Sequence, residues 1–144
     1  MNEIYLYAIK LLQGRDYTLA ALRHKLELKF GSVPGEVIDE LLRKKFLNDR
    51  RFAEEYVARH KDRGNLLVRE DLLKRGIEEP LINEILSRTE WPSLKQALTD
   101  KMNQWHLRAP LQSRDAARLF RVLLRLGYDE DTIREELEQL REPW

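Results

Sequence analysis

Four arginines near the carboxyl-terminal end of the chain are spaced to share one side of a helix. They are Arg114, Arg118, Arg121 and Arg125, at relative positions 0, 4, 7 and 11. A rotation of about 100° per residue gathers them within roughly 60° of arc. A guanidinium group is planar and binds a carboxylate or a phosphate through two parallel hydrogen bonds. The spacing therefore predicts an arginine stripe, defined by these four residues, whose chemistry is anion binding.

The charge around the stripe leaves two interpretations open. Residues 91–128 carry seven Lys or Arg against two Asp, whereas residues 129–144 carry seven acids against two Arg. In the first interpretation the stripe binds an anionic partner. In the second, the acidic helix that follows Gly127 neutralises the stripe within the chain, as many surface charges are neutralised.

Other basic residues lie in the middle of the chain. Lys44-Lys45 and Arg50-Arg51 flank a predicted helix junction, and Arg59, Lys61 and Arg63 end another helix. Each group sits among acids, which favours a solvated, ion-paired surface. A second candidate contact set applies if the interface lies outside the stripe. It comprises Arg59, Lys61, Arg63, Lys74 and Arg75.

No pattern in the chain indicates catalysis. His24, His60 and His106 are isolated, and the six glycines form neither a phosphate-binding loop nor a dinucleotide fingerprint. The chain has no cysteine, which excludes a thiolate nucleophile, a disulfide and a cysteine metal site. We expect no catalytic residue, no metal site and no cofactor.

The helices that must position the stripe follow a frame that occurs three times. Its anchors are Gly31, Gly76 and Gly127, separated by 45 and 51 residues. Each has a leucine three residues before it (Leu28, Leu73, Leu124), a β-branched residue six after it (Val37, Ile82, Ile133) and a leucine ten after it (Leu41, Leu86, Leu137). A glycine just past a helix can take the left-handed conformation that ends it, and the later pair shares one helix face.

The frame predicts an all-α protein made of three three-helix repeats, at residues 1–45, 46–90 and 91–144, in one elongated, curved array. Within it, Thr18 and Ser113 are predicted N-caps, and Asn48 or Asp49 caps a third helix. The first helix is expected at residues 2–13 and ends at Gly14.

The remaining features concern the surroundings of the protein. The apolar runs fall short of the roughly 18 residues that span a bilayer, and the first residues lack a basic leader, so we expect a soluble, unexported, cytoplasmic protein. The three tryptophans are expected to be packing anchors.

Taken in order, the blocks RDYTLAALRHKL (residues 15–26), FLNDRRFAEEYV (46–57), DLLKRGI (71–77) and RLFRVLLRLGYDEDTI (118–133) resemble the bacterial RecX family. The resemblance covers nearly the whole chain. It implies a regulator without catalytic activity that acts on the RecA recombinase. Such a regulator binds in the groove of the RecA filament on single-stranded DNA, and thereby limits filament growth, strand exchange, ATPase and coprotease action. It further implies roles in DNA repair, recombination and the SOS response.

Two alternatives stay open beside the resemblance. The helix at residues 113–126 suits a module that binds nucleic acid directly, and the repeat array suits a general protein-interaction scaffold. We expect a monomer that contacts no membrane, with weak direct contact to DNA left open. Salt distinguishes direct DNA binding, because phosphate contacts weaken steeply with ionic strength.

Overall fold

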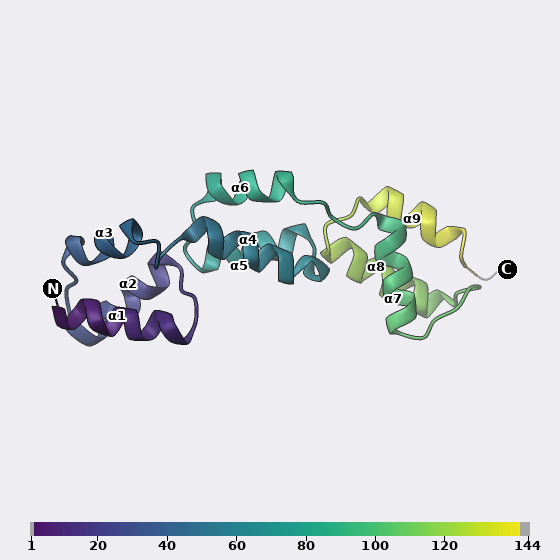
Figure 1. Cartoon of the computed structure of the whole chain (residues 1–144). Coiled ribbons are helices and arrows are strands. Elements are labelled where there is room, and N and C mark those ends of the chain that lie inside the picture. Colours follow the sequence, from purple (N-terminus) through teal and green to yellow (C-terminus); the bar gives the residue numbers. More distant parts are fainter. Residues whose placement is uncertain (1, 142–144) are drawn as a thin grey trace. The chain divides into compact units, whose positions relative to one another are not determined.

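The computed structural model describes residues 2–141, and this part of the chain consists of short helices joined by loops (Figure 1). The α-helices are α1 (Asn2–Gly14), α2 (Leu19–Phe30), α3 (Gly35–Arg43), α4 (Asp49–Arg59), α5 (Asn65–Lys74), α6 (Glu79–Arg88), α7 (Leu94–Gln104), α8 (Ser113–Arg125) and α9 (Glu130–Glu138). A 3-10 turn, η1 (Lys61–Arg63), precedes α5. Within residues 2–141 the only extended pairing is an isolated bridge between Leu111 and Arg141. The all-α prediction is confirmed.

The helices group into two compact units. The first unit contains Met1–Arg59 and Arg69–Thr89, and the second contains His60–Val68 and Glu90–Trp144. Helix α5 therefore contributes its first turn to the second unit and its remainder to the first. The repeat boundaries at residues 1–45, 46–90 and 91–144 stay a prediction.

The glycine frame ends helices as predicted. Gly31, Gly76 and Gly127 have φ values of +86°, +82° and +100°. After α5, the Gly76 and Ile77 amides donate to the carbonyl oxygens of Leu73 and Leu72, and the turn after α8 repeats this pattern. Such paired bonds satisfy carbonyl groups that a helix end leaves without partners.

Equivalent apolar positions of the frame are buried or exposed alike each time they occur. Val37, Ile82 and Ile133 are fully buried, and Leu41, Leu86 and Leu137 are at most 5% exposed. By contrast, Leu28, Leu73 and Leu124 are exposed. The frame thus marks the buried face of the helix that follows each glycine, while the leucine that precedes the glycine faces solvent.

In the first unit, the start of α2 is fixed by residues distant in sequence. The hydroxyl of Thr18 accepts from the Ala21 amide, as predicted for an N-cap, and donates to the carbonyl oxygen of Arg75 (2.8 Å). The Leu19 amide donates to the Asp49 carboxylate (2.8 Å). Asp49 therefore caps α2, and Asn48 caps α4 by accepting from the Arg51 amide. Because these bonds span 57 and 30 residues, they hold α2 against the rest of the unit.

In the second unit, α8 packs against both α7 and α9. Its core comprises Ala97, Leu98, Leu111, Leu119, Leu123, Ile133 and Leu137. The N-cap of α8 is Gln112, so the prediction that Ser113 is the cap was wrong. Ser113 is the first helical residue, and its hydroxyl accepts from the Arg141 guanidinium beside the Leu111–Arg141 bridge. The segment after α9 thus returns to the start of α8, where Arg141 binds the Ser113 hydroxyl that was expected to cap α8.

Candidate arginine interface

Helix α8 presents the arginine stripe because its two sides differ sharply. Ala116, Leu119 and Leu123 are buried against the core, at 6%, 0% and 0% exposure. All four stripe arginines lie on the opposite side and are exposed. The prediction that the stripe faces solvent is confirmed.

The stripe is not neutralised by ion pairs within the described part of the chain. Among residues 2–141, no carboxylate oxygen lies within 4.0 Å of a guanidinium nitrogen of the four arginines, which is the distance that defines an ion pair. The α9 acids pair within their own segment instead, Glu130 with Arg134 (2.7 Å) and Glu138 with Arg141 (3.4 Å). The charge of the stripe therefore remains available to an external anion.

Trp105 gives part of the stripe a fixed geometry. The Arg118 guanidinium carbon lies 3.8 Å from the centre of the Trp105 ring, which is a close cation–aromatic contact. Trp105, Arg118, Arg121, Val122 and Arg125 line a hollow of about 190 Å³ on the surface of the second unit. The hollow combines three guanidinium groups with an indole ring and an apolar valine.

A left-handed residue sets the position of Trp105. Trp105 closes the end of α7, and His106 after it has a φ of +58°. The Leu107 amide then donates back to the carbonyl oxygen of Met102 (2.8 Å). This turn ends α7 and leaves the indole half-buried against the core, where Arg118 can cover it.

The second candidate contact set is divided between the two units. Arg59, Lys74 and Arg75 belong to the first unit, and Lys61 and Arg63 to the second. All five are exposed. Arg75 already has internal contacts, because its guanidinium donates to the carbonyl oxygen of Asp71 (3.1 Å) and lies 4.7 Å from the centre of the Tyr56 ring. Arg59 donates to the carbonyl oxygen of Glu55 (3.4 Å).

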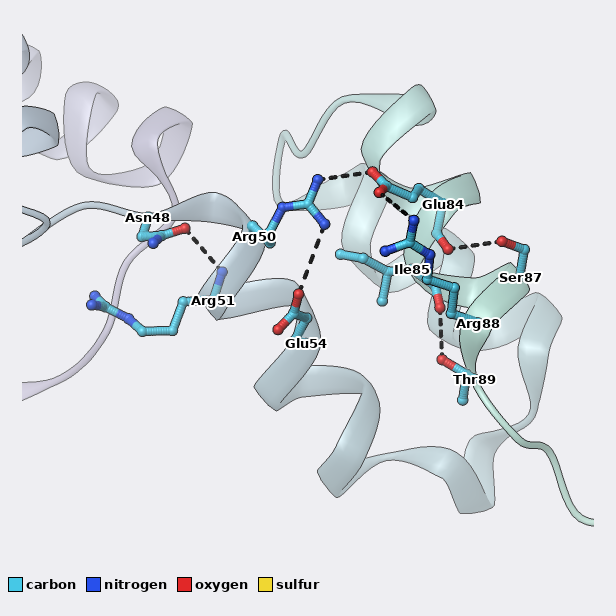
Figure 2. Close-up of polar contacts among 9 residues, drawn as sticks. All are labelled: Asn48, Arg50, Arg51, Glu54, Glu84, Ile85, Ser87, Arg88 and Thr89. Carbon is cyan, nitrogen blue, oxygen red and sulfur yellow. Dashed lines mark hydrogen bonds and ion pairs between the residues drawn. The ribbon is translucent and has the colours of Figure 1, made fainter.

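Ion pairs occupy basic residues of the first unit, in contrast to the stripe. Figure 2 shows Arg50 between two carboxylates, bonded to Glu84 of α6 (2.8 Å) and paired with Glu54 of its own helix (3.8 Å). Glu84 also pairs with Arg88 (3.3 Å). The Arg51 side chain points away from this network in Figure 2, donates to the carbonyl oxygen of Lys45 (3.0 Å) and pairs with Asp16 (3.7 Å). Lys44 pairs with Glu40 (3.3 Å). The solvated, ion-paired interpretation therefore describes Lys44, Arg50 and Arg51.

Several titratable groups have a pKa altered by the contacts that they make in the fold. The bond from Arg50 lowers the pKa of Glu84, and the bond from the Thr132 amide lowers the pKa of Asp129, the N-cap of α9. Burial raises the pKa of Tyr128, whose hydroxyl donates to the carbonyl oxygen of Pro92 (2.6 Å). Each shift has a structural cause, and none involves the hollow.

Two further findings concern metal binding and membrane spanning among the described residues. Among them, no group of three or more His, Cys, Asp or Glu residues is arranged to hold a metal ion. None of their helices is both long and apolar enough to span a bilayer.

Sequence reasoning missed the role of Trp105. We expected the indole to be a packing anchor, and it does pack against the core. The contact between the Arg118 guanidinium and the Trp105 ring depends on how α7 and α8 pack together. The spacing of residues within one helix cannot predict such a contact. Trp144 lies outside the described residues.

The described residues form an all-helical protein. Comparison with known proteins identifies a three-helix domain in the middle of the chain. The family model described as RecX, second three-helix domain, matches residues 48–86. The regulatory protein RecX of Trichlorobacter lovleyi is 33% identical over 147 aligned residues, which cover 96% of each chain. The regulatory protein RecX of Halorhodospira halophila is 32% identical over 132 residues, covering 88% of this chain and 81% of that one. This chain belongs to the RecX family of regulatory proteins.

A solved structure supports the fold. The crystal structure of RecX from Lactobacillus salivarius superposes with a TM-score of 0.72 at 22% sequence identity, over 95% of this chain and 96% of that chain. The family resemblance drawn from the sequence blocks is confirmed, and so is the helical architecture.

Proposed function

We propose that this protein regulates the RecA recombinase by binding the RecA filament on single-stranded DNA, with the arginine stripe of α8 as a contact surface. It acts without catalysis, by occupying the filament groove, and so limits filament growth, strand exchange, ATPase and coprotease action. It works in the cytoplasm, in DNA repair, recombination and the SOS response. Family membership supports the regulatory role, and the resemblance stated from the sequence supplies RecA as the partner.

The observation that carries the choice of surface is the absence of ion pairs at the stripe within residues 2–141. A partner carboxylate or phosphate can bind these guanidinium groups without displacing an internal acid. Arg50, held by Glu54 and Glu84, would first have to lose those contacts. Arginine is also among the residues enriched at protein interfaces.

The second contact set is proposed as a separate, additional contact with the filament. Arg59, Lys61, Arg63, Lys74 and Arg75 are exposed cations, and we assign them a weaker, supporting role. Exposed charges at the rim of an interface affect association rate and salt dependence more than affinity.

The direct test is the ATPase activity of RecA on single-stranded DNA, measured with increasing amounts of this protein. We expect ATP hydrolysis to fall as the protein binds the filament. Unchanged hydrolysis at a large excess of the protein would contradict the proposal. Binding of the protein to naked single-stranded DNA, measured over a range of salt, distinguishes the alternative. Tight, steeply salt-dependent binding without RecA would indicate a direct nucleic-acid module.

A further inference from the structure

We propose that the hollow formed by Trp105, Arg118, Arg121, Val122 and Arg125 is a receptor for the carboxylates of an acidic protein segment. This inference rests on the proposed function, and it names the chemistry of the ligand: carboxylate side chains of the partner protein rather than phosphates of its DNA.

The geometry of Arg118 suits such a ligand. Its guanidinium carbon lies over the Trp105 ring, 3.8 Å from the ring centre, and arginine can make such a contact while its N–H groups still bind an anion. This contact restricts a flexible side chain before the ligand arrives, which lowers the entropy that binding must remove. Trp105 is therefore a positioning residue for Arg118.

The remaining walls supply charge and apolar contact together. Arg121 and Arg125 border the same hollow and have no carboxylate within 4.0 Å among the described residues. Val122 and the indole form its apolar surface. An aspartate or glutamate side chain has a carboxylate for the guanidinium groups and methylene carbons for the apolar surface. Arginine binds a carboxylate through two parallel hydrogen bonds.

The surroundings disfavour single-stranded nucleic acid. Proteins that bind such strands stack bases on open aromatic faces along a basic groove. Here the Arg118 guanidinium lies over the Trp105 ring, and the Arg134 guanidinium lies 5.4 Å from the centre of the Phe120 ring. Acidic residues also follow the end of the stripe directly, at Asp129, Glu130 and Asp131. A long polyanion that continues along α8 would meet these acids, whereas a short acidic segment at the hollow would not.

The test uses two probes: a short, end-blocked oligoglutamate peptide, and an oligothymidylate with the same number of negative charges. Each is titrated into the full chain while the arginine Nε–H signals are followed by NMR. The test variant is Arg121→Gln/Arg125→Gln. The matched control is Arg134→Gln, because Arg134 belongs to the same unit and also lies over an aromatic ring, yet is paired with Glu130.

We expect oligoglutamate to shift the signals of Arg118, Arg121 and Arg125. The double substitution should weaken its binding about tenfold or more, because charge-assisted bonds are lost, and Arg134→Gln should leave it unchanged. Trp105→Leu should weaken binding severalfold, whereas Trp105→Phe, which retains an aromatic ring, should restore most of it. Thermal melts of all variants show whether each one is folded.

Three results would overturn the inference. The first is that oligoglutamate does not bind at the hollow. The second is that oligothymidylate displaces oligoglutamate from the same arginine signals with equal or higher affinity. The third is that oligoglutamate binding persists in the folded Arg121→Gln/Arg125→Gln variant. The RecA assay is read separately. If the protein inhibits RecA but does not bind oligoglutamate at the hollow, the carboxylate inference fails and the proposed function stands. If RecA is unaffected, the proposed function fails.

Discussion

The backbone of Gly64 lies directly against the backbone of Leu126. A Cβ atom built on Gly64 would be 2.5 Å from the carbonyl oxygen of Leu126 and 2.8 Å from its Cα. Gly127 directly follows Leu126, and a Cβ atom built on it would be 3.3 Å from the Leu66 side chain. Two glycines with positive φ thus let the start of α5 meet the turn that ends α8, within the second unit.

This contact predicts unequal effects of glycine substitution. Gly64→Ala should destabilise the protein by several kcal/mol, because the methyl group is strained at positive φ and also overlaps the Leu126 backbone. Gly31→Ala should cost only about 1 kcal/mol, because Gly31 has a similar φ but no atom within 4 Å of the added carbon. Urea unfolding of both variants measures the difference. Equal losses would mean that the α5–α8 contact contributes nothing beyond backbone strain.

The frame of repeated positions predicts equivalent core losses. Leu41, Leu86 and Leu137 are buried, so truncating any one of them to Ala should cost on the order of 2 to 5 kcal/mol. Leu28→Ala provides the control, because Leu28 is 75% exposed and surface substitutions usually change stability little. Chemical denaturation tests all four. A small loss of stability at one of the three buried leucines would show that its environment differs from those of the other two.

Lys45 offers a stabilising substitution. It has a φ of +63° and follows α3 where the Phe46 amide donates back to the carbonyl oxygen of Leu41 (2.9 Å). Glycine takes this conformation without the strain of a Cβ atom, so Lys45→Gly should raise the free energy of unfolding by roughly 0.5–1 kcal/mol. Lys44→Gly is the control, because Lys44 has a φ of −83° and should lose stability. A loss of stability in both variants would contradict the account of this turn.

The cap of α9 predicts a dependence on pH. Asp129 accepts from the amide and the hydroxyl of Thr132, and the amide bond lowers the pKa of Asp129 from its ordinary value of 3.8. A lowered pKa in the folded state means that the carboxylate contributes stability above that ordinary value and loses it as pH falls through the folded value. The melting temperature of Asp129→Ala should therefore lie below that of the natural chain at neutral pH, and the gap should narrow in acid.

An Asp129→Asn variant separates charge from capping. The amide oxygen can still cap the helix but does not titrate near these pH values. Its melting temperature relative to Asp129→Ala should stay constant as pH falls. If the difference in melting temperature between the natural chain and Asp129→Ala is the same at neutral and acidic pH, the charge of the carboxylate is not the source of that difference.

Much of the fold could be predicted from local patterns in the sequence. The positive φ of Gly31, Gly76 and Gly127 and the burial of the residues that follow them depend on a helix end and one helix face. Both can be read from neighbouring residues. The cap at Thr18 was predictable for the same reason.

What sequence reasoning missed depends on contacts between distant segments. Asp49 caps α2 from 30 residues away, and Ser113 binds Arg141 instead of capping α8. His106 takes a left-handed conformation that is uncommon for residues other than glycine. The stripe itself was predicted from its spacing, but the hollow was not, because the Trp105–Arg118 contact depends on the packing of two helices.

The most direct test of the central claim is RecA ATPase on single-stranded DNA with a variant in which Arg114, Arg118, Arg121 and Arg125 are all changed to Glu. Because the four side chains are exposed, helicity and melting temperature should change little, while inhibition of RecA should be lost. An Arg50→Glu variant serves as the control, since Arg50 lies outside the stripe and is already paired. A folded quadruple variant that inhibits RecA as strongly as the natural chain would contradict the claim that the α8 stripe is the contact surface.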